Sequence, residues 1–186
     1  MSQPTATGTA KVLLVDDRAD NLVALEAMLQ GLPVDPVAVS SGEAALKRLL
    51  IDDFAVILMD AYMPGMDGFE TAGHVKRRER TRHIPIIFLT AADGDARLAL
   101  RGYAAGAVDY LTKPFDPWVL RAKVAIFADL WAKNQQLRQQ AAQWSRLSAA
   151  AHEAVRLLAE PGQSEQARAA LLAALPAVPR EAASAA

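Results

Sequence analysis

The sequence predicts an α/β domain built on a five-stranded, parallel, doubly wound sheet, followed by a long extended last helix. Two observations predict this fold. Between residues 11 and 113, short apolar runs alternate with segments of helical periodicity, and strict alternation of strand and helix favours a parallel sheet with right-handed crossovers. Most of the runs are apolar at consecutive positions, which is typical of strands buried on both faces.

The predicted strands differ in one respect. Four of them are rich in Val, Ile, Leu and Phe, whereas one contains Pro36. Proline cannot donate a hydrogen bond to a sheet ladder, so we expect this strand at an edge of the sheet. In chain order, the predicted strands are residues 11–16, 34–40 (the one with Pro36), 54–60, 84–90 and 108–113.

Helices are predicted between the strands. Leu22, Leu25 and Leu29 recur at spacings of three and four between the first two strands. After the second strand, Ser41 and Gly42 precede a segment rich in alanine and leucine, which predicts a second helix. A third helix is expected to end in the basic stretch 74–83. We interpret this stretch as a solvated helix end rather than a nucleic-acid contact, because positive charges there complement the helix dipole.

The last predicted helix is unusually long. Pro117 suits a first helical turn, and no strong helix breaker follows before Pro161 and Gly162. The two ends of the chain are polar or alanine-rich and are predicted to be disordered. The expected organisation is a disordered start (1–9), a domain core (10–116), the long helix (117–160), a short helical segment (161–178) and a disordered tail (179–186).

The long helix also shows a partial heptad pattern. With Leu120 at an a position, the a and d positions are mainly apolar from Phe127 to Trp144. Asn134 falls at an a position, where asparagine fixes the register of parallel two-stranded coiled coils, but Lys123 falls at d and weakens the seam. Three interpretations stay open: a dimeric coiled coil, a helix that folds back on its own domain, and a connector to a separate output. We expect a homodimer through this helix.

Composition narrows the classes of function. Lys and Arg total 20 against 21 Asp and Glu, and this balance favours neither a nucleic-acid binder nor a membrane-surface protein. There is no cysteine, which excludes disulfides, thiolate metal sites and thiol nucleophiles. The polar N-terminus lacks the apolar run of a signal peptide, and charges interrupt the apolar segment 118–131. We therefore expect a cytoplasmic protein without a membrane span.

Polar residues stand where the apolar runs stop: Asp16, Asp17, Asp60, Thr90 and Lys113. In open α/β sheets, ligands bind outside the carboxyl ends of the strands. Two unit charges ~4 Å apart repel by roughly 4 kcal/mol at an effective dielectric constant of 20, so three carboxylates gathered there require a cation. Oxygen ligands of this kind suit Mg²⁺. The sequence therefore predicts a magnesium site, with the lysine as a second positive charge.

Four motifs resemble the receiver domain of two-component response regulators. They occur in the family's order and at its intervals, and the resemblance covers about residues 10–130. It implies a CheY-like, flavodoxin-like fold with the strand order 2-1-3-4-5. The motifs are LLVDDR (13–18), LMDAYMPGMDG (58–68), FLTAAD (88–93) and DYLTKPF (109–115).

The resemblance implies a role for each acidic residue. Asp60 would be the phosphoacceptor, attacking a phosphoryl group that comes from a histidine kinase or a phosphotransfer protein. Asp17 and Asp60 would bind Mg²⁺ directly, and Asp16 would hold it through water. The backbone carbonyl of Tyr62 would supply one more oxygen ligand.

The remaining motif residues would respond to the phosphate. Lys113 would pair with Asp60 and later with a phosphoryl oxygen. The Thr90 hydroxyl would follow the phosphate, and Tyr110 would be the switch aromatic that moves inward with it. The peptide bond between Lys113 and Pro114 would be cis, which sets the direction of the lysine.

Two further positions concern the lifetime of the phosphate. The family pattern implies that the residues two positions after Asp60 and Thr90 control water access to the acyl phosphate. These residues are Tyr62 and Ala92, and neither carries an acid or an amide. We therefore expect slow self-dephosphorylation.

The sequence as a whole predicts a phosphorylation-dependent signalling module without a separate output enzyme. Its output is expected through dimerisation or binding of an unknown downstream protein by the last helix. Two alternatives stay open: a phosphorylation-independent receiver-like scaffold, and the receiver part of a larger signalling enzyme system. A DNA-binding output is disfavoured, because too little chain follows residue 160 for a helix-turn-helix.

Overall fold

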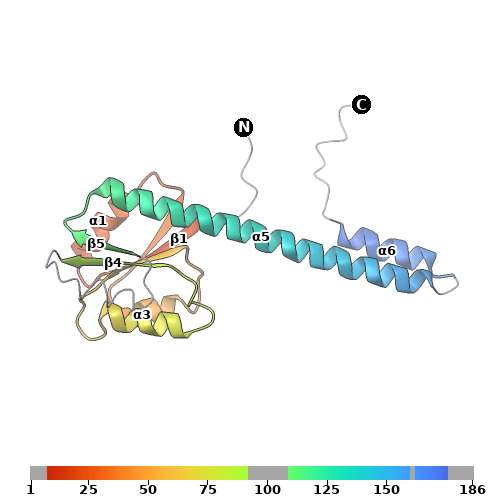
Figure 1. Ribbon diagram of the computed structural model, residues 1–186, viewed down its shortest axis with the longest axis horizontal. Coiled ribbons are helices and arrows are strands. Elements are labelled where there is room, and N and C mark those ends of the chain that lie inside the picture. Colours follow the sequence, from red (N-terminus) through yellow and green to blue (C-terminus); the bar gives the residue numbers. More distant parts are fainter. Residues whose placement is uncertain (1–7, 92–108, 160–161, 176–186) are drawn as a thin grey trace, which may run out of the picture. The chain divides into compact units, whose positions relative to one another are not determined.

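The computed structural model describes residues 8–91, 109–159 and 162–175, and the chain divides into two units, Met1–Lys133 and Asn134–Ala186. The first unit contains one parallel sheet of five strands in the order β2-β1-β3-β4-β5 (Figure 1). Both the fold class and the strand order expected from the sequence are confirmed. The strands are β1 (Ala10–Val15), β2 (Val34–Val39), β3 (Val56–Asp60), β4 (Ile86–Ala91) and β5 (Asp109–Lys113).

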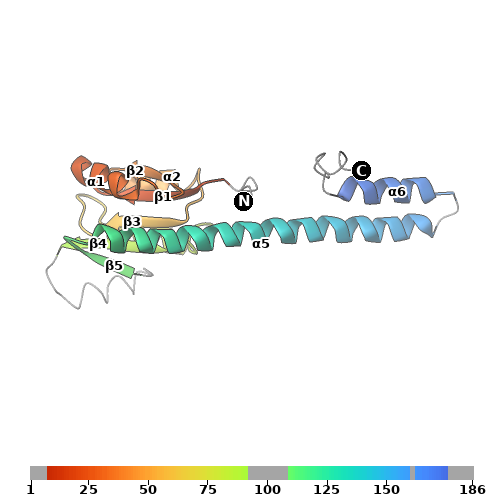
Figure 2. The ribbon, with the colours of Figure 1, turned by 90° about the horizontal axis from the view of Figure 1, so that it is seen from above.

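Helices cover both faces of this sheet. The pair α1 and α5 lies on one face, and the pair α2 and α3 lies on the other (Figures 1 and 2). None of the described helices is both long and apolar enough to span a membrane. The helices are α1 (Ala19–Leu29), α2 (Gly42–Arg48), α3 (Gly68–Arg77), α5 (Pro117–Leu158) and, in the second unit, α6 (Ser164–Ala174).

The strands alternate their side chains between two apolar clusters. In β1, Leu13 and Val15 pack toward α2 and α3, whereas Val12 and Leu14 pack toward α1 and α5. Successive residues of a strand point to opposite faces, so a strand covered on both sides must be apolar throughout. This explains the continuous apolar runs in the sequence.

The strand boundaries differ from the expected ones where an apolar residue precedes the ladder. The third and fourth strands begin two residues later than predicted, although Phe54 and Ile84 are both buried. These side chains fill the core from the turns that lead into the strands. An apolar residue indicates burial, but it does not show that the residue pairs with a neighbouring strand. The apolar runs therefore overestimate the lengths of these two strands. The strand with Pro36 lies at the sheet edge, as predicted.

The basic stretch 74–83 takes part in local structure at the end of α3. The Lys76 ammonium donates to the carbonyls of Arg82 and Ile84, at 3.0 and 2.7 Å, and Arg80 donates to the carbonyl of Leu50 at 2.6 Å. These bonds satisfy backbone oxygens in the turns around the helix end. Several of its charges thus have a structural use within the domain.

The first turns of α5 belong to the core of the first unit. Leu120 and Val124 are fully buried against the sheet, and Phe127 packs on the same cluster. The Arg121 guanidinium donates to the carbonyls of Met28 and Gln30, which end α1. Because Phe127 is used inside the domain, the apolar seam available to a partner begins later than the heptads predict, at Leu130, which is 49% exposed.

This packing predicts how far the chain can be shortened. A chain that ends at Asp116 lacks Leu120 and Val124, each of which stabilises the fold by about 1.5–3 kcal/mol. The loss of about 3–6 kcal/mol is comparable with the stability of a whole domain, about 5–15 kcal/mol. We expect this chain to be unfolded and a chain ending at Lys133 to unfold cooperatively, as measured by circular dichroism in urea. Equal urea midpoints for the two chains would contradict the assignment of these turns to the core.

The second unit consists of the rest of α5 and of α6, which runs back along it (Figures 1 and 2). Within the described part of this unit only Ala154 and Ala167 are buried. The two helices therefore meet through small side chains.

Candidate functional site

The ladder register brings the predicted site residues to one edge of the sheet. The pairing of β1 with β3 ends at Val15 and Met59, so the next residues, Asp16 and Asp60, lie at neighbouring strand ends. The register between β3 and β4 places Thr90 one residue beyond the partner of Asp60, and Thr90 is buried there. Residues from separate segments of the sequence thus converge because parallel strands end at the same edge.

Three carboxylates form a cluster at this edge. Asp16, Asp17 and Asp60 each offer an oxygen atom, and these oxygens all lie within 4.8 Å of one another. Asp16 is fully buried, the Asp60 side chain is 13% exposed, and Asp17 is exposed. A group of hard oxygen donors that opens to solvent on one side suits a divalent cation that keeps some of its water.

The Asp16 carboxylate is held by several donors. It accepts hydrogen bonds from the backbone N–H of Arg18 at 3.0 Å and from the Asn21 side-chain amide at 2.8 and 3.0 Å. Sequence reasoning missed Asn21 as a site residue. The available signal was its position in the first turn of a helix that starts directly after the Asp16–Asp17 pair. Its amide fixes the direction of a carboxylate that could not otherwise be buried.

Lys113 bridges two of the carboxylates. Its Nζ lies 3.0 Å from Asp16 Oδ2 and 3.1 Å from Asp60 Oδ1. Burial alone would lower the pKa of Lys113, but the hydrogen bonds to Asp16 and Asp60 and their negative charges raise it above its usual value. The lysine is therefore a permanent cation in the site. The Lys113–Pro114 peptide bond is cis, as predicted.

Asp60 is harder to ionise than an ordinary aspartate. Burial raises its pKa, the hydrogen bond and charge of Lys113 lower it, and the negative charges of Asp16 and Asp17 raise it again, so that the pKa lies above 3.8. One lysine therefore does not fully compensate the carboxylates. A second cation at the cluster would favour the ionised form of Asp60, which is the form that can act as a nucleophile.

A glycine allows the chain to return to Asp60 after the loop that follows β3. A Cβ atom on Gly68 would lie 2.2 Å from the Asp60 carbonyl oxygen and 3.0 Å from Ala61 Cα. The Gly68 N–H donates to the Ala61 carbonyl at 3.1 Å, and Asp67 caps the start of α3 by accepting from the Glu70 N–H at 2.7 Å. The last glycine of the MPGMDG segment is thus required by close backbone contact beside Asp60.

Tyr62, two residues after Asp60, begins a chain of packed aromatic rings. The Tyr62 ring is 6.4 Å from the Phe69 ring at an interplanar angle of 80°, and Phe69 lies 4.7 Å from Phe88. Tyr62 is 52% exposed, and Tyr110 on β5 is 44% exposed. Ala92, the other residue assigned to water access, lies outside the described residues.

The family model described as "Response regulator receiver domain" matches residues 12–125. The chain belongs to this family. Response regulator PleD of Caulobacter vibrioides is 37% identical over 149 residues, which cover 80% of this chain and 33% of PleD. Sensor histidine kinase GacS of Pseudomonas protegens is 35% identical over 141 residues, which cover 72% of this chain and 15% of GacS. The chain therefore spans a third or less of the length of these relatives.

Solved structures of receiver domains share the fold. A response regulator from Chloroflexus aurantiacus superposes with a TM-score of 0.60 at 33% identity, covering 66% of this chain and 99% of that chain. The receiver domain of sensor histidine kinase PA1611 from Pseudomonas aeruginosa has a TM-score of 0.60 at 30% identity, covers 66% of this chain and 98% of its own, and has a magnesium ion coordinated in its active-site cleft. Receiver domains thus bind Mg²⁺ in an acidic site of the kind seen here.

Proposed function

We propose that this receiver domain is a phosphorylation-dependent signalling module whose Asp60 accepts a phosphoryl group from a histidine kinase or a phosphotransfer protein. One observation carries the proposal. Asp60 lies at the carboxyl end of β3, with its Oδ1 3.1 Å from the Lys113 ammonium, inside a cluster of three carboxylates whose oxygens lie within 4.8 Å of one another. This combines a nucleophile, a fixed cation and a place for a second cation.

The Asp60 carboxylate attacks the phosphorus atom of the donor and forms an oxygen–phosphorus bond, while the bond to the leaving group breaks and its electrons depart with that group. Asp16, Asp17, Asp60 and the Tyr62 carbonyl would hold Mg²⁺. Bound there, Mg²⁺ would supply positive charge to the phosphoryl group. Lys113 supplies the other positive charge, and Asn21 and the Arg18 N–H keep Asp16 in place throughout.

The proposed response uses residues on β4 and β5. The Thr90 hydroxyl turns toward a phosphoryl oxygen, and Tyr110 then moves inward from its exposed position. Movement of these two side chains alters the surface to which a partner protein binds. We place the receiver domain at residues 10–116, with the long helix 117–160 as an extension whose first turns complete its core.

We expect Mg²⁺ to stabilise the protein more as the pH rises. Because the pKa of Asp60 is raised in the folded state, ionising it costs stability as the pH rises from 3.8 through the folded pKa. Below this pH range Asp60 is protonated, and its proton competes with Mg²⁺ for the carboxylate. The increase in Tm on adding MgCl₂ should therefore grow across the window and then level off, as measured by scanning calorimetry at several pH values. An increase that is the same at pH values below and above the window would contradict this assignment.

The slow-dephosphorylation proposal rests on Tyr62, which offers neither an acid nor an amide to orient water. Tyr62→Asn should speed the loss of phosphate on the order of tenfold, less than the 10²–10⁴ that a positioned acid–base group supplies, because an amide only orients the water. Tyr62→Phe keeps the ring against Phe69 and serves as the control. Loss of phosphate is followed after the donor is removed, and equal rates for the wild type and Tyr62→Asn would rule out this role.

We also propose a cytoplasmic location and a homodimer formed through the long helix, with an unidentified downstream protein as the recipient of the signal. A second candidate is the receiver part of a larger signalling enzyme system. The relatives favour this candidate, because the matched region is only a part of each of them. One relative is a probable cyclic di-GMP phosphodiesterase of Vibrio cholerae, which is 37% identical over 115 residues that cover 25% of that protein.

A phosphate mimic tests the proposed function against a phosphorylation-independent scaffold. Beryllofluoride with MgCl₂ should change the fluorescence of Trp118, which lies five residues after Lys113, and the hydrogen exchange of β4 and β5. MgCl₂ with fluoride alone is the control. A wild-type chain that shows no response to beryllofluoride would favour the scaffold.

A further inference from the structure

The helix pair of the second unit has one apolar side that no described residue covers. We call it the hairpin face. Its members are large apolar side chains with a small alanine between them, and they come from both helices. Trp144 is 73% exposed, Leu158 60% and Leu175 55%. The hairpin face consists of Trp144, Ala151, Val155 and Leu158 of α5 and Leu171 and Leu175 of α6.

Helical periodicity explains why these residues share one side. The less exposed positions of α5 in this unit include 147, 150, 154 and 157. Those of α6 are 167, 170 and 174, preceded by the N-cap residue 163, so these rows face each other. Each residue is turned by about 100° from the one before it. The residues that follow these rows, such as Ala151 on α5 and Leu171 on α6, therefore turn to the same side, because the two helices are antiparallel (Figures 1 and 2).

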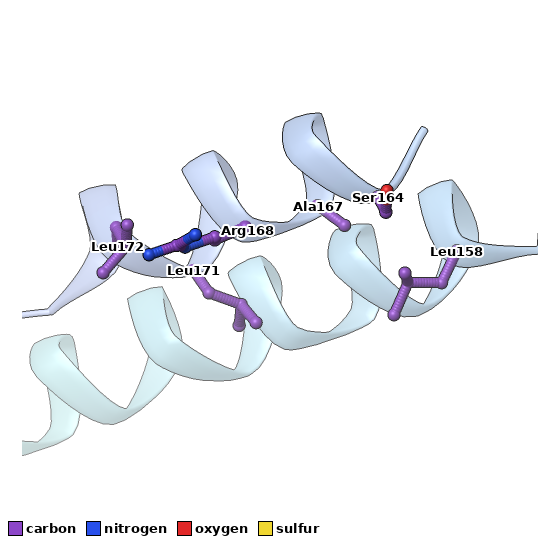
Figure 3. A pocket seen from close by; sticks show the side chains of 6 residues that line it. All are labelled: Leu158, Ser164, Ala167, Arg168, Leu171 and Leu172. Atoms are coloured by element: carbon purple, nitrogen blue, oxygen red, sulfur yellow. The ribbon is translucent and has the colours of Figure 1, made fainter. Parts of the chain in front are cut away.

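A pocket of about 340 Å³ opens between the two helices on this side. Figure 3 shows Leu171 pointing from α6 toward α5, with Leu158 on α5 farther along the pair. Charged residues of α5 are placed differently. Helical spacing turns Arg146 and Glu153 to the opposite side of the helix pair, where Glu153 pairs with Arg156 at 2.7 Å. On α6, Arg168 lines the pocket beside Leu171 and Leu172, so the hairpin face is mainly apolar with one positive charge beside it.

The helix pair needs further burial of its apolar surface to be stable. Within residues 134–159 and 162–175 only Ala154 and Ala167 are buried, and two methyl groups stabilise a helical hairpin very little. The segment 176–186, with the sequence PAVPREAASAA, has Val178 as its single large aliphatic residue. That segment lacks the apolar side chains to cover six positions.

We propose that a second copy of this chain covers the hairpin face, so that two hairpins form a four-helix bundle. The inference rests on the homodimer proposed above and names the surface that forms it, including α6. Leu137, Trp144, Ala151 and Leu158 repeat every seven residues, and interlocking side chains in a bundle require the same repeat in the partner. An identical copy supplies that repeat.

Surface area and charge agree with a second copy. Seven exposed large side chains, each presenting about 100 Å², give about 700 Å², close to the ~800 Å² per partner of a standard interface. Five of them are the large residues of the hairpin face, and the other two, Leu137 and Leu172, are exposed residues beside it. Residues 134–175 carry four arginines and three glutamates, so charge repulsion between two copies is weak.

Sedimentation equilibrium of the full chain tests the proposal. We expect a dimer, and we expect Leu171→Gln combined with Leu175→Gln to raise its Kd by about 100-fold or more, since each change occurs twice in the interface. Gln139→Glu on α5 and Ala169→Gln on α6 lie away from the hairpin face and should leave the Kd unchanged. A monomeric wild type would overturn the proposal. A wild-type Kd for the α6 double variant would also overturn it, because pairing would then use α5 alone.

Cross-linking gives a second readout that does not depend on a destabilising change. The chain has no cysteine, so a single Ala151→Cys substitution marks the middle of the hairpin face. A short bis-maleimide should link two Ala151→Cys chains and should not link two Gln139→Cys chains. Equal linking of both variants, or linking of neither, would count against the bundle.

The same variants separate this inference from the proposed function. Asp60 lies in the other unit of the chain, so phosphorylation by acetyl phosphate is measured independently of the oligomeric state. A chain that is phosphorylated but monomeric contradicts the bundle and the proposed homodimer, but not the role of Asp60 as phosphoacceptor. A chain that is dimeric but not phosphorylated contradicts only the proposed function.

Discussion

Asp60→Asn is expected to abolish phosphorylation by acetyl phosphate in the presence of Mg²⁺. An amide cannot act as the nucleophile, and it removes one of the three carboxylates of the cluster. The variant should stay folded. Since the raised pKa of Asp60 shows that its charge is unfavourable in the metal-free site, the neutral side chain should raise the metal-free Tm at neutral pH. The increase in Tm caused by MgCl₂ should shrink in the same variant.

Asp53→Asn is the matched control for this change. Asp53 precedes the same strand at its opposite end, is 62% exposed and lies 3.8 Å from Arg80. We expect this variant to be phosphorylated at the wild-type rate, as followed by intact-protein mass spectrometry. Phosphorylation of Asp60→Asn at a wild-type level would place the phosphoacceptor elsewhere in the chain. A lower metal-free Tm for Asp60→Asn would contradict the account of the Asp60 charge.

Lys113→Met is expected to slow phosphorylation by on the order of 10²–10³, the usual effect of removing one group that stabilises transition-state charge. It should also destabilise the metal-free protein, because Asp16 and Asp60 lose the ammonium at 3.0 and 3.1 Å. Removing one partner of a fully buried pair costs about 3–5 kcal/mol, and because the Lys113 side chain is 30% exposed we expect about 1–3 kcal/mol. The loss should be smaller with Mg²⁺, which supplies positive charge to the same carboxylates.

Lys47→Met on α2 provides the control, since it removes an exposed lysine outside the site. Its urea midpoint and phosphorylation rate should match the wild type. The decisive comparison is between the two lysine variants with and without MgCl₂. If Mg²⁺ leaves the stability difference between them unchanged, then Lys113 and the metal do not act on the same carboxylates.

The second unit shows where pattern analysis reaches its limit. The heptads of α5 are readable in the sequence, but the same pattern runs through Leu120 and Phe127, which pack inside the domain, and through Trp144, which is exposed. An apolar stripe indicates that one side of a helix is buried, but it does not identify the element or partner that buries it. The alanine row by which α6 meets α5 carries little periodic signal, because alanine is common on every face of these helices.

By itself, the sequence determined the alternation of strands and helices, the edge position of the strand with Pro36, and the five polar residues at the ends of strands. Each of these follows from local pattern, since continuous apolar runs report strands buried on both faces and parallel strands end at one edge. Only the tertiary structure decided which partners complete the site. Asn21 on Asp16, Gly68 against the Asp60 backbone and Lys113 between two carboxylates all depend on contacts across segments. Such contacts are set by how the elements pack, and no local pattern encodes that packing.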